Sequence, residues 1–278
     1  MRIILFFLIA ILLVYESVGQ MRLTDEMKET EEQLRASTKQ INQFFRRFNG
    51  EEDENGKRYY ATDKNFRTAS LRRKYVPVLF DTQTSQIDPD VAEGFVKFIT
   101  DKKTPHFLDF HKDDWFAEVS TTFTYNGKEI QGLLYMKLQQ QGLGYEWIIE
   151  DVAFDQFQKW FDKDTTETKK FMHPMSHELD FMTLRKAFLK NNHAEQFTAR
   201  EYTPDFLTIF LYEMNQGNMK FVSVKDVRFH FFSVDGYYFS LYNFNRPGYN
   251  SGWLISGLVP LANEDQKKQM KDYIYDKN

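Results

Sequence analysis

The chain has 278 residues, of which 42% are hydrophobic and 27% charged, a balance typical of a globular protein rather than a disordered one. Its formal net charge is −4 and its longest basic run is Arg72-Arg73-Lys74, so the composition excludes a nucleic-acid-binding surface. We expect that triplet to form an exposed helix face. The chain contains no cysteine, which excludes disulfides, thiol nucleophiles and thiolate metal sites. Aromatic residues make up 17% of the sequence and favour sheet-rich cores.

The N-terminus has the layout of a secretory signal peptide. After a short basic start, an apolar run over residues 3–15 is too short to span a bilayer comfortably, and Ser17 and Gly19 place small residues before Gln20. We therefore expect cleavage of a signal peptide (1–19) near Gly19/Gln20, which leaves no membrane span in the mature protein. An uncleaved N-terminal anchor is the alternative. The predicted location is the periplasm or the cell surface and extracellular space, and the absence of cysteine and of Asn-X-Ser/Thr sequons favours a bacterial source.

The first half of the chain carries a regular succession of structural signals. Asp88-Pro89-Asp90 predicts a helix start, with Asp88 as the N-cap and Pro89 in the first helical position. An alternating strand over Trp115–Tyr125 then ends at the hairpin dipeptide Asn126-Gly127. The series is completed by a return strand over 130–138, a glycine-bearing loop over 139–144 and a strand that begins near Trp147.

The second half repeats this order. Thr203-Pro204-Asp205 predicts another helix start, and the strand that contains Val227, Phe229 and Phe231 ends at Asp235-Gly236. A strand over Tyr237–Phe244, a loop over 245–252 and a strand that begins at Trp253 follow. An earlier amphipathic helix precedes each series. We interpret the repeated order as an internal duplication.

The duplication predicts the domain organisation and the fold class. After the signal peptide, we expect a first α+β domain over 20–161, a polar linker over 162–170 and a second α+β domain over 171–278. The fold class is α+β, with two similar domains that each pack a curved antiparallel sheet on N-terminal helices.

This order of elements resembles that of the NTF2-like and cystatin-like superfamilies, whose domains wrap a sheet around helices. The resemblance covers most of the mature chain and implies a concave pocket in each domain, but it supplies no catalytic residues. The aromatic-rich, cysteine-free sequence with Val18-Gly19-Gln20 at its cleavage region also resembles exported proteins of Bacteroidetes bacteria.

Two groups of histidines are candidate metal or acid–base sites. His173 and His177 have the spacing of zinc ligands on a helix, but Pro174 and Ser176 favour a helix start at that point, so we expect capping and surface histidines. A second polar cluster consists of His106, His111, Asp113 and Asp114. It has no recurring third ligand group and is interpreted as a solvated strand entry. We therefore predict no metal site.

No constellation of catalytic residues is recognised. The chain has neither a nucleophile elbow nor a phosphate-binding glycine loop, and Glu150-Asp151 occupy consecutive strand positions that point to opposite faces. His230 lies between Phe229 and Phe231, so it faces away from them and either lines a pocket or is exposed. No catalytic residue and no cofactor are predicted.

The candidate ligand-binding residues lie near the C-terminus. The rings of Tyr238 and Tyr242 either line a ligand site or belong to the core. The loop over 245–250 combines Arg246 and Tyr249 with amides, as binding loops often do, although an ordinary hairpin connection explains it equally. With His230, these four residues form the predicted ligand-binding set.

The sequence favours an exported, non-enzymatic binding or assembly module of the bacterial envelope. Its partner is expected to be a protein or a glycan, and not a nucleic acid. The alternative is a small-ligand carrier or enzyme that uses an NTF2-like pocket, with His230 or Tyr238 as its polar group.

Overall fold

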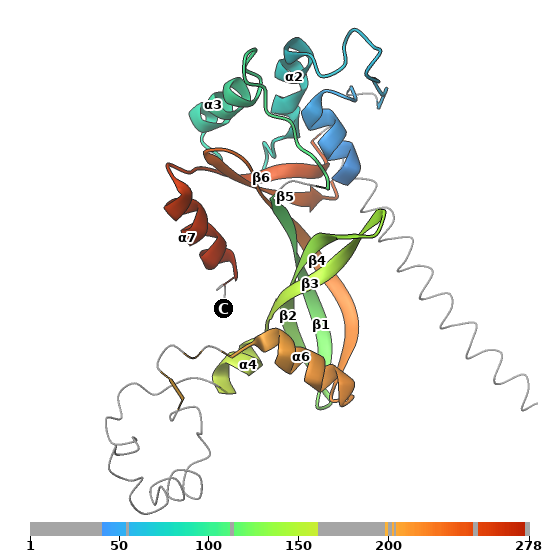
Figure 1. Cartoon of the computed structure of the whole chain (residues 1–278), viewed down its shortest axis with the longest axis vertical. Coiled ribbons are helices and arrows are strands. Elements are labelled where there is room, and N and C mark those ends of the chain that lie inside the picture. The colour runs from blue at the N-terminus through green and yellow to red at the C-terminus, as the bar shows by residue number, and fades with distance from the viewer. Residues whose placement is uncertain are drawn as a thin grey trace, which may run out of the picture. The chain divides into compact units, whose positions relative to one another are not determined.

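The structure is a computed structural model that describes residues 41–53, 56–111, 114–160, 198–199, 202, 204–246 and 250–275 (Figure 1). The expected signal peptide and linker, the pair His173 and His177, and Tyr249 lie outside the described residues. Among the helices that are described, none is both long and apolar enough to cross a membrane.

The described strands form one six-stranded antiparallel sheet in the order β3-β2-β1-β4-β5-β6, which confirms the α+β class. The strands are β1 (Trp115–Tyr125), β2 (Lys128–Gln141), β3 (Gly144–Ala153), β4 (Met219–Val234), β5 (Tyr237–Phe244) and β6 (Gly252–Pro260). The two predicted meanders are therefore neighbours in a single sheet, joined where β1 pairs with β4.

Turn chemistry sets the ends of both hairpins. Asn126 and Gly127 have φ angles of 49° and 79°, and Gly236 has a φ of 76°, so the two predicted dipeptides supply the left-handed residues that tight hairpin turns require. The bounds of β1 and β5 agree with the predicted strands. β4 begins earlier than its alternating pattern indicates, at Met219.

The helices within the described residues are one over 41–49 and the elements α2 (Ala69–Tyr75), η1 (Val76–Leu79), α3 (Pro89–Ile99), α4 (Asp155–Trp160), α6 (Phe206–Asn215) and α7 (Glu264–Tyr275). The predicted cap of α3 is confirmed, because the Asp88 side chain accepts a hydrogen bond from the backbone N–H of Asp90. For α6 the predicted start is shifted: the N-cap is Asp205, which accepts from the backbone N–H of Thr208.

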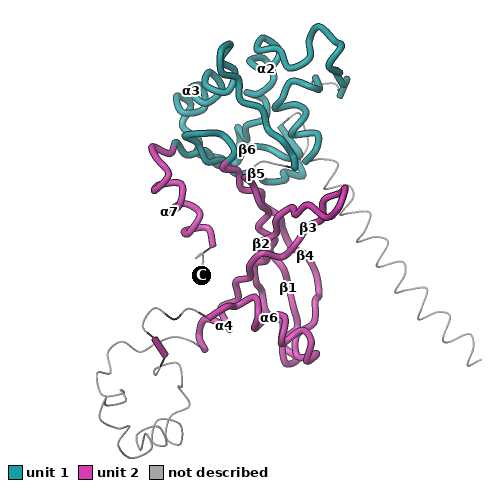
Figure 2. The backbone as a smooth tube through the Cα atoms, in the orientation of Figure 1, with its two compact units in different colours: residues 1–113, 233–260 teal, residues 114–232, 261–278 magenta. Residues whose placement is uncertain are grey.

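The chain divides into two compact units, each built from two segments (Figure 2). Unit 1 comprises residues 1–113 and 233–260, and unit 2 comprises residues 114–232 and 261–278. Each unit combines segments from both halves of the chain, whereas the repeat predicts two contiguous domains.

Unit 1 has an aromatic core between its N-terminal helices and the strands β5 and β6. Phe48 stacks on Phe239 with ring centroids 6.1 Å apart, and Phe95 of α3 lies 5.7 Å from Phe239 and 5.1 Å from Tyr237. Phe48, Phe95 and Phe239 are fully buried. The helices of the first half of the chain thus pack on strands of the second half.

Arg72 is buried in unit 1, so the expectation of an exposed Arg72-Arg73-Lys74 triplet is wrong at its first residue. Its guanidinium donates hydrogen bonds to the backbone carbonyl oxygens of Phe48 (2.9 Å), Ile99 (2.8 Å) and His106. Burial lowers the pKa of Arg72 to about 10. The side chain saturates carbonyl groups at the ends of two helices, which explains why a cation lies in the core.

Unit 2 has its own aromatic core. Phe123 of β1 lies 5.6 Å from Phe154 and 5.4 Å from Phe210 of α6, so a helix of the second half packs on strands of the first half. Gly132 of β2 is required there, because a Cβ at that position would lie 2.0 Å from the ring of Phe154. Each unit therefore combines helices from one half of the chain with strands from the other.

Candidate functional site

His230 of unit 2 is buried and pairs with the half-buried Glu118. Its Nε2 atom lies 3.0 Å from Oε2 of Glu118, and its ring stacks on Phe116 with centroids 5.0 Å apart. Phe116 and His230 are register partners in β1 and β4, whereas Phe231 stacks on Trp115. His230 thus faces away from Phe231 as predicted, and its side chain is fully buried rather than exposed.

The helix α7 packs on this face of unit 2. The hydroxyl of Tyr135 donates a hydrogen bond to the backbone carbonyl oxygen of Ile274 (2.7 Å), and Ile274 is fully buried. Lys271 donates to both carboxylate oxygens of Asp114 at 2.9 and 2.8 Å, and its Nζ lies 5.1 Å from the centroid of the Phe232 ring. A mixed polar and aromatic contact therefore holds α7.

A β-bulge adds the carboxylate of Glu150 to this contact. The register between β2 and β3 skips Glu150, whose Oε2 accepts a hydrogen bond from the hydroxyl of Tyr275 (2.6 Å). Burial, this hydrogen bond and the charges of Glu150 and Asp151 all raise the pKa of Tyr275. Glu150 thus contacts Tyr275 directly, at a bulge that interrupts the regular alternation expected for Glu150 and Asp151.

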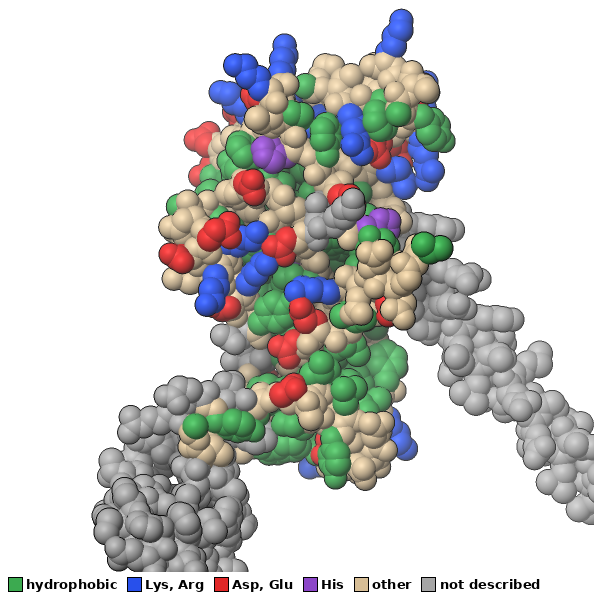
Figure 3. Space-filling view, in the orientation of Figure 1, with side chains coloured by type: hydrophobic (Ala, Val, Ile, Leu, Met, Phe, Trp, Pro, Cys, Tyr) green, Lys and Arg blue, Asp and Glu red, His purple; other side chains and the backbone are tan. Residues whose placement is uncertain are grey.

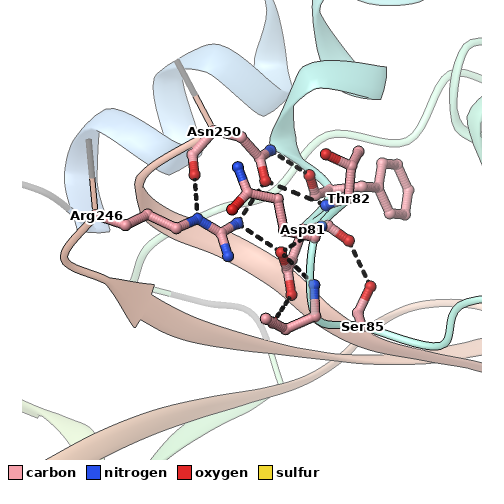
Figure 4. A network of polar contacts seen from close by, with 8 residues as sticks. Asp81, Thr82, Ser85, Arg246 and Asn250 are labelled. Atoms are coloured by element: carbon pink, nitrogen blue, oxygen red, sulfur yellow. Dashed lines mark hydrogen bonds and ion pairs between the residues drawn. The ribbon is translucent and has the colours of Figure 1, made fainter. Parts of the chain in front are cut away.

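Arg246 lies in a second polar network, in unit 1 (Figure 4). Its guanidinium pairs with Asp81, whose side chain is 1% exposed, and donates to the backbone carbonyl oxygen of Asn250 (2.6 Å). The Asn250 amide in turn donates to the carbonyl oxygen of Phe80 (2.7 Å) and accepts from the backbone N–H of Thr82 (3.1 Å). The network joins the chain at residues 80–85 to the loop after β5.

The charge of Asp81 is stabilised by this network. Burial acts to raise the pKa of Asp81, but hydrogen bonds from Thr84, Arg246 and the backbone N–H groups of Gln83 and Thr84 outweigh burial and hold the pKa well below its ordinary range. Arg246 and its loop therefore have a structural role in unit 1. Their predicted role in ligand binding stays a prediction.

The other predicted site residues are dispersed. Tyr238 of β5 is buried, and Tyr242 is half-buried with its ring 5.2 Å from that of Phe244. His106 stacks on Phe98 at 4.5 Å in unit 1, whereas Asp114 binds Lys271 in unit 2. His230 thus belongs to unit 2 and Tyr238, Tyr242 and Arg246 to unit 1, and their shared ligand-binding role stays a prediction. Over the described residues, no three His, Asp or Glu side chains are placed to hold a metal ion.

The most conspicuous surface feature of unit 2 was not predicted. Phe221, Val222 and Val224 in the first half of β4 are 49%, 46% and 45% exposed, and the exposed Lys220 and Lys225 bracket them. We call these five residues the β4 surface. Leu211 and Tyr212 on the preceding helix α6 are also exposed. In Figure 3, hydrophobic side chains gather over the strands and helices of unit 2, whereas charged side chains of both signs follow α7.

Sequence signals for this surface are weak. The segment Met219–Asp226 does not alternate cleanly, and the register between β1 and β4 shifts twice within it, skipping Val222 and Lys225. A run of β-branched and aromatic residues between two lysines was the available clue.

Comparisons with protein-family models, with curated proteins and with solved structures found no match to this chain. The fold itself defines the class: an α+β protein with a six-stranded antiparallel sheet.

Proposed function

We propose that the protein is an exported, non-enzymatic binding module that engages a protein partner through unit 2. The observation that carries this proposal is the exposure of Phe221, Val222 and Val224 within four consecutive residues of one strand. Contiguous exposed apolar residues cost solubility and mark interaction sites in soluble proteins. Export rests on the signal-peptide layout of the N-terminal sequence, and the NTF2-like or cystatin-like character remains part of the proposal.

We propose further that the two halves are duplicated copies that exchanged their helices. Three features support this: the strand order is symmetric about the β1–β4 pair, each half contributes a helix to the other half's strands, and the third strands share a bulge. The bulge residue is Glu150 in β3 and Ser256 in β6, each three residues after a tryptophan.

A second candidate function is a small-ligand carrier or enzyme. The pair of His230 and Glu118 favours it, because an imidazole and a carboxylate 3.0 Å apart form an acid–base unit when a substrate reaches them. Turnover or saturable binding of a small molecule that is lost in His230→Phe and Glu118→Gln would support this function over the binding module.

Photo-crosslinking tests the binding module. A benzoylphenylalanine is placed at position 221, or as a matched control at Tyr60 of unit 1 or Tyr273 of α7, which are 63% and 65% exposed. The full chain is then illuminated with envelope extract of its source. We expect one discrete adduct from position 221 only, sensitive to protease. Equal adducts from all three positions, or none from 221, would contradict binding through the β4 surface of unit 2. An adduct that only glycosidase removes would identify a glycan instead.

A further inference from the structure

We propose that the β4 surface binds an extended segment of a partner protein as an added strand, and that this segment carries Asp or Glu on both sides of its apolar residues. The inference rests on the proposed binding function and specifies the partner's chemistry and mode of binding.

The position of β4 makes strand addition available. Among the described strands of unit 2 the order is β3-β2-β1-β4, so β4 is the outermost of them, and Figure 1 shows the long β4 beside β1. β4 has 16 residues, whereas its hairpin partner β5 has 8, so half of β4 extends beyond the length of β5. The backbone N–H and C=O groups of an outer strand are templates for a further strand.

The side chains of this segment suit an apolar strand partner. Phe221 and Val224 are register partners of Phe123 and Thr121, which are both buried, and yet each is close to half exposed itself. Phe221 also packs edge to face on Phe123 at 5.5 Å, which fixes its ring in place. A strand laid beside β4 would cover these side chains with cross-strand neighbours.

The charges of the β4 surface favour a partner segment with acidic residues. Lys220 and Lys225 are both exposed and bracket the apolar residues, and the segment 219–225 contains no acidic residue. A second copy of the chain paired antiparallel about this segment would set Lys220 opposite Lys225, which is repulsive. A segment with acidic residues at both ends would instead place opposite charges across each end.

Fluorescence anisotropy with two end-blocked hexapeptides tests the inference on the full chain. The acidic probe is Glu-Val-Thr-Val-Thr-Glu and the basic probe is Lys-Val-Thr-Val-Thr-Lys. We expect the acidic probe to bind about tenfold more tightly, since two cross-strand charge pairs change sign between the probes. The double charge reversal Lys220→Glu/Lys225→Glu should invert this preference. The matched reversal Lys102→Glu/Lys103→Glu, at exposed lysines of unit 1, should leave it unchanged.

A second variant, Phe221→Thr/Val224→Thr, keeps the charges and the strand propensity, and it should weaken binding of the acidic probe. Several results would overturn the inference: equal binding of both probes, binding that the Lys220→Glu/Lys225→Glu variant does not alter, or no binding of either probe. Dimerisation in sedimentation equilibrium that Phe221→Thr/Val224→Thr abolishes would overturn it in favour of a second copy. A crosslinked partner at position 221 without any preference for the acidic probe would overturn this inference alone and leave the proposed binding function intact.

Discussion

The guanidinium of Arg72 donates a hydrogen bond to the carbonyl oxygen of Ile99 at the end of α3, 27 residues away in the sequence. The same side chain reaches the last turn of the helix over 41–49 through the carbonyl oxygen of Phe48. One buried cation thus joins three segments of unit 1 by donating to a backbone carbonyl oxygen in each.

Replacement of Arg72 should destabilise unit 1 strongly. In Arg72→Met the methylenes are retained, but three backbone carbonyl groups each lose a charged donor, so we expect the free energy of unfolding to fall by about 3 kcal/mol. The matched control Arg73→Met removes an exposed neighbour that bonds Thr100 at 3.2 Å and should cost less than about 1 kcal/mol. Urea unfolding followed by circular dichroism measures both. Equal losses in the two variants would show that burial of Arg72 has no energetic consequence.

The network around Asp81 predicts acid sensitivity. Because the folded-state pKa of Asp81 lies below that of the unfolded chain, its contribution to stability is full above about pH 5 and is lost as the pH falls below about 4. In Asp81→Asn the urea midpoint should therefore fall less between pH 7 and pH 3 than in the unmodified protein. The control Glu93→Gln, at an exposed position in α3, should show the same fall of the urea midpoint with pH as the unmodified protein. If the urea midpoint of Asp81→Asn fell as much between pH 7 and pH 3 as that of the unmodified protein, the Asp81 carboxylate would not be a source of the acid sensitivity.

Gly132 should not tolerate a side chain. A Cβ there would lie within 2.0–2.6 Å of three ring atoms of Phe154, and Gly132→Ala should lower the free energy of unfolding by about 2 kcal/mol or more. The second change Phe154→Leu should recover part of that loss. Gly144→Ala, in the same hairpin, is the control, because a Cβ at that position approaches only one atom, at 3.9 Å. Thermal unfolding compares the variants, and a stable Gly132→Ala protein would show that β2 and Phe154 are packed differently.

The pair of His230 and Glu118 should be coupled in stability. Glu118→Ala withdraws the carboxylate from a fully buried imidazole and should cost about 1–3 kcal/mol, whereas Glu118→Gln keeps a hydrogen-bonding side-chain oxygen and should cost less. A double-mutant cycle with His230→Phe measures the coupling. Additive effects of the two single changes would mean that the 3.0 Å contact contributes nothing.

Most of the features that could be predicted from the sequence depend on residues that are neighbours in the chain. The bounds of β1 and β5, the two hairpin dipeptides and the cap at Asp88 depend on neighbouring residues, and the structure has them where the pattern places them. That His230 faces away from Phe229 and Phe231 also follows from strand alternation, because β4 is regular at that point, whereas its burial does not follow from alternation.

Features that depend on distant partners were missed. Glu118 lies 112 residues from His230, and Asp81 lies 165 residues from Arg246, so no local pattern joins them. The burial of Arg72 follows from carbonyl groups of other segments, not from its own basic triplet. The packing of α3 on β5 and of α6 on β1 escaped prediction for the same reason, because the order of elements along the chain does not say which elements pack together.

The exchange of helices between the two halves is the central structural claim, and paramagnetic broadening in the full chain tests it most directly. Because the chain contains no cysteine, a nitroxide can be attached uniquely at Glu93→Cys on α3 or at Tyr212→Cys on α6, both exposed. We predict that the α3 label broadens amide signals of β5 and β6 most strongly, and that the α6 label broadens those of β1 and β3. The reverse pattern, with α3 nearest β1–β3 and α6 nearest β5 and β6, would contradict the exchange of helices.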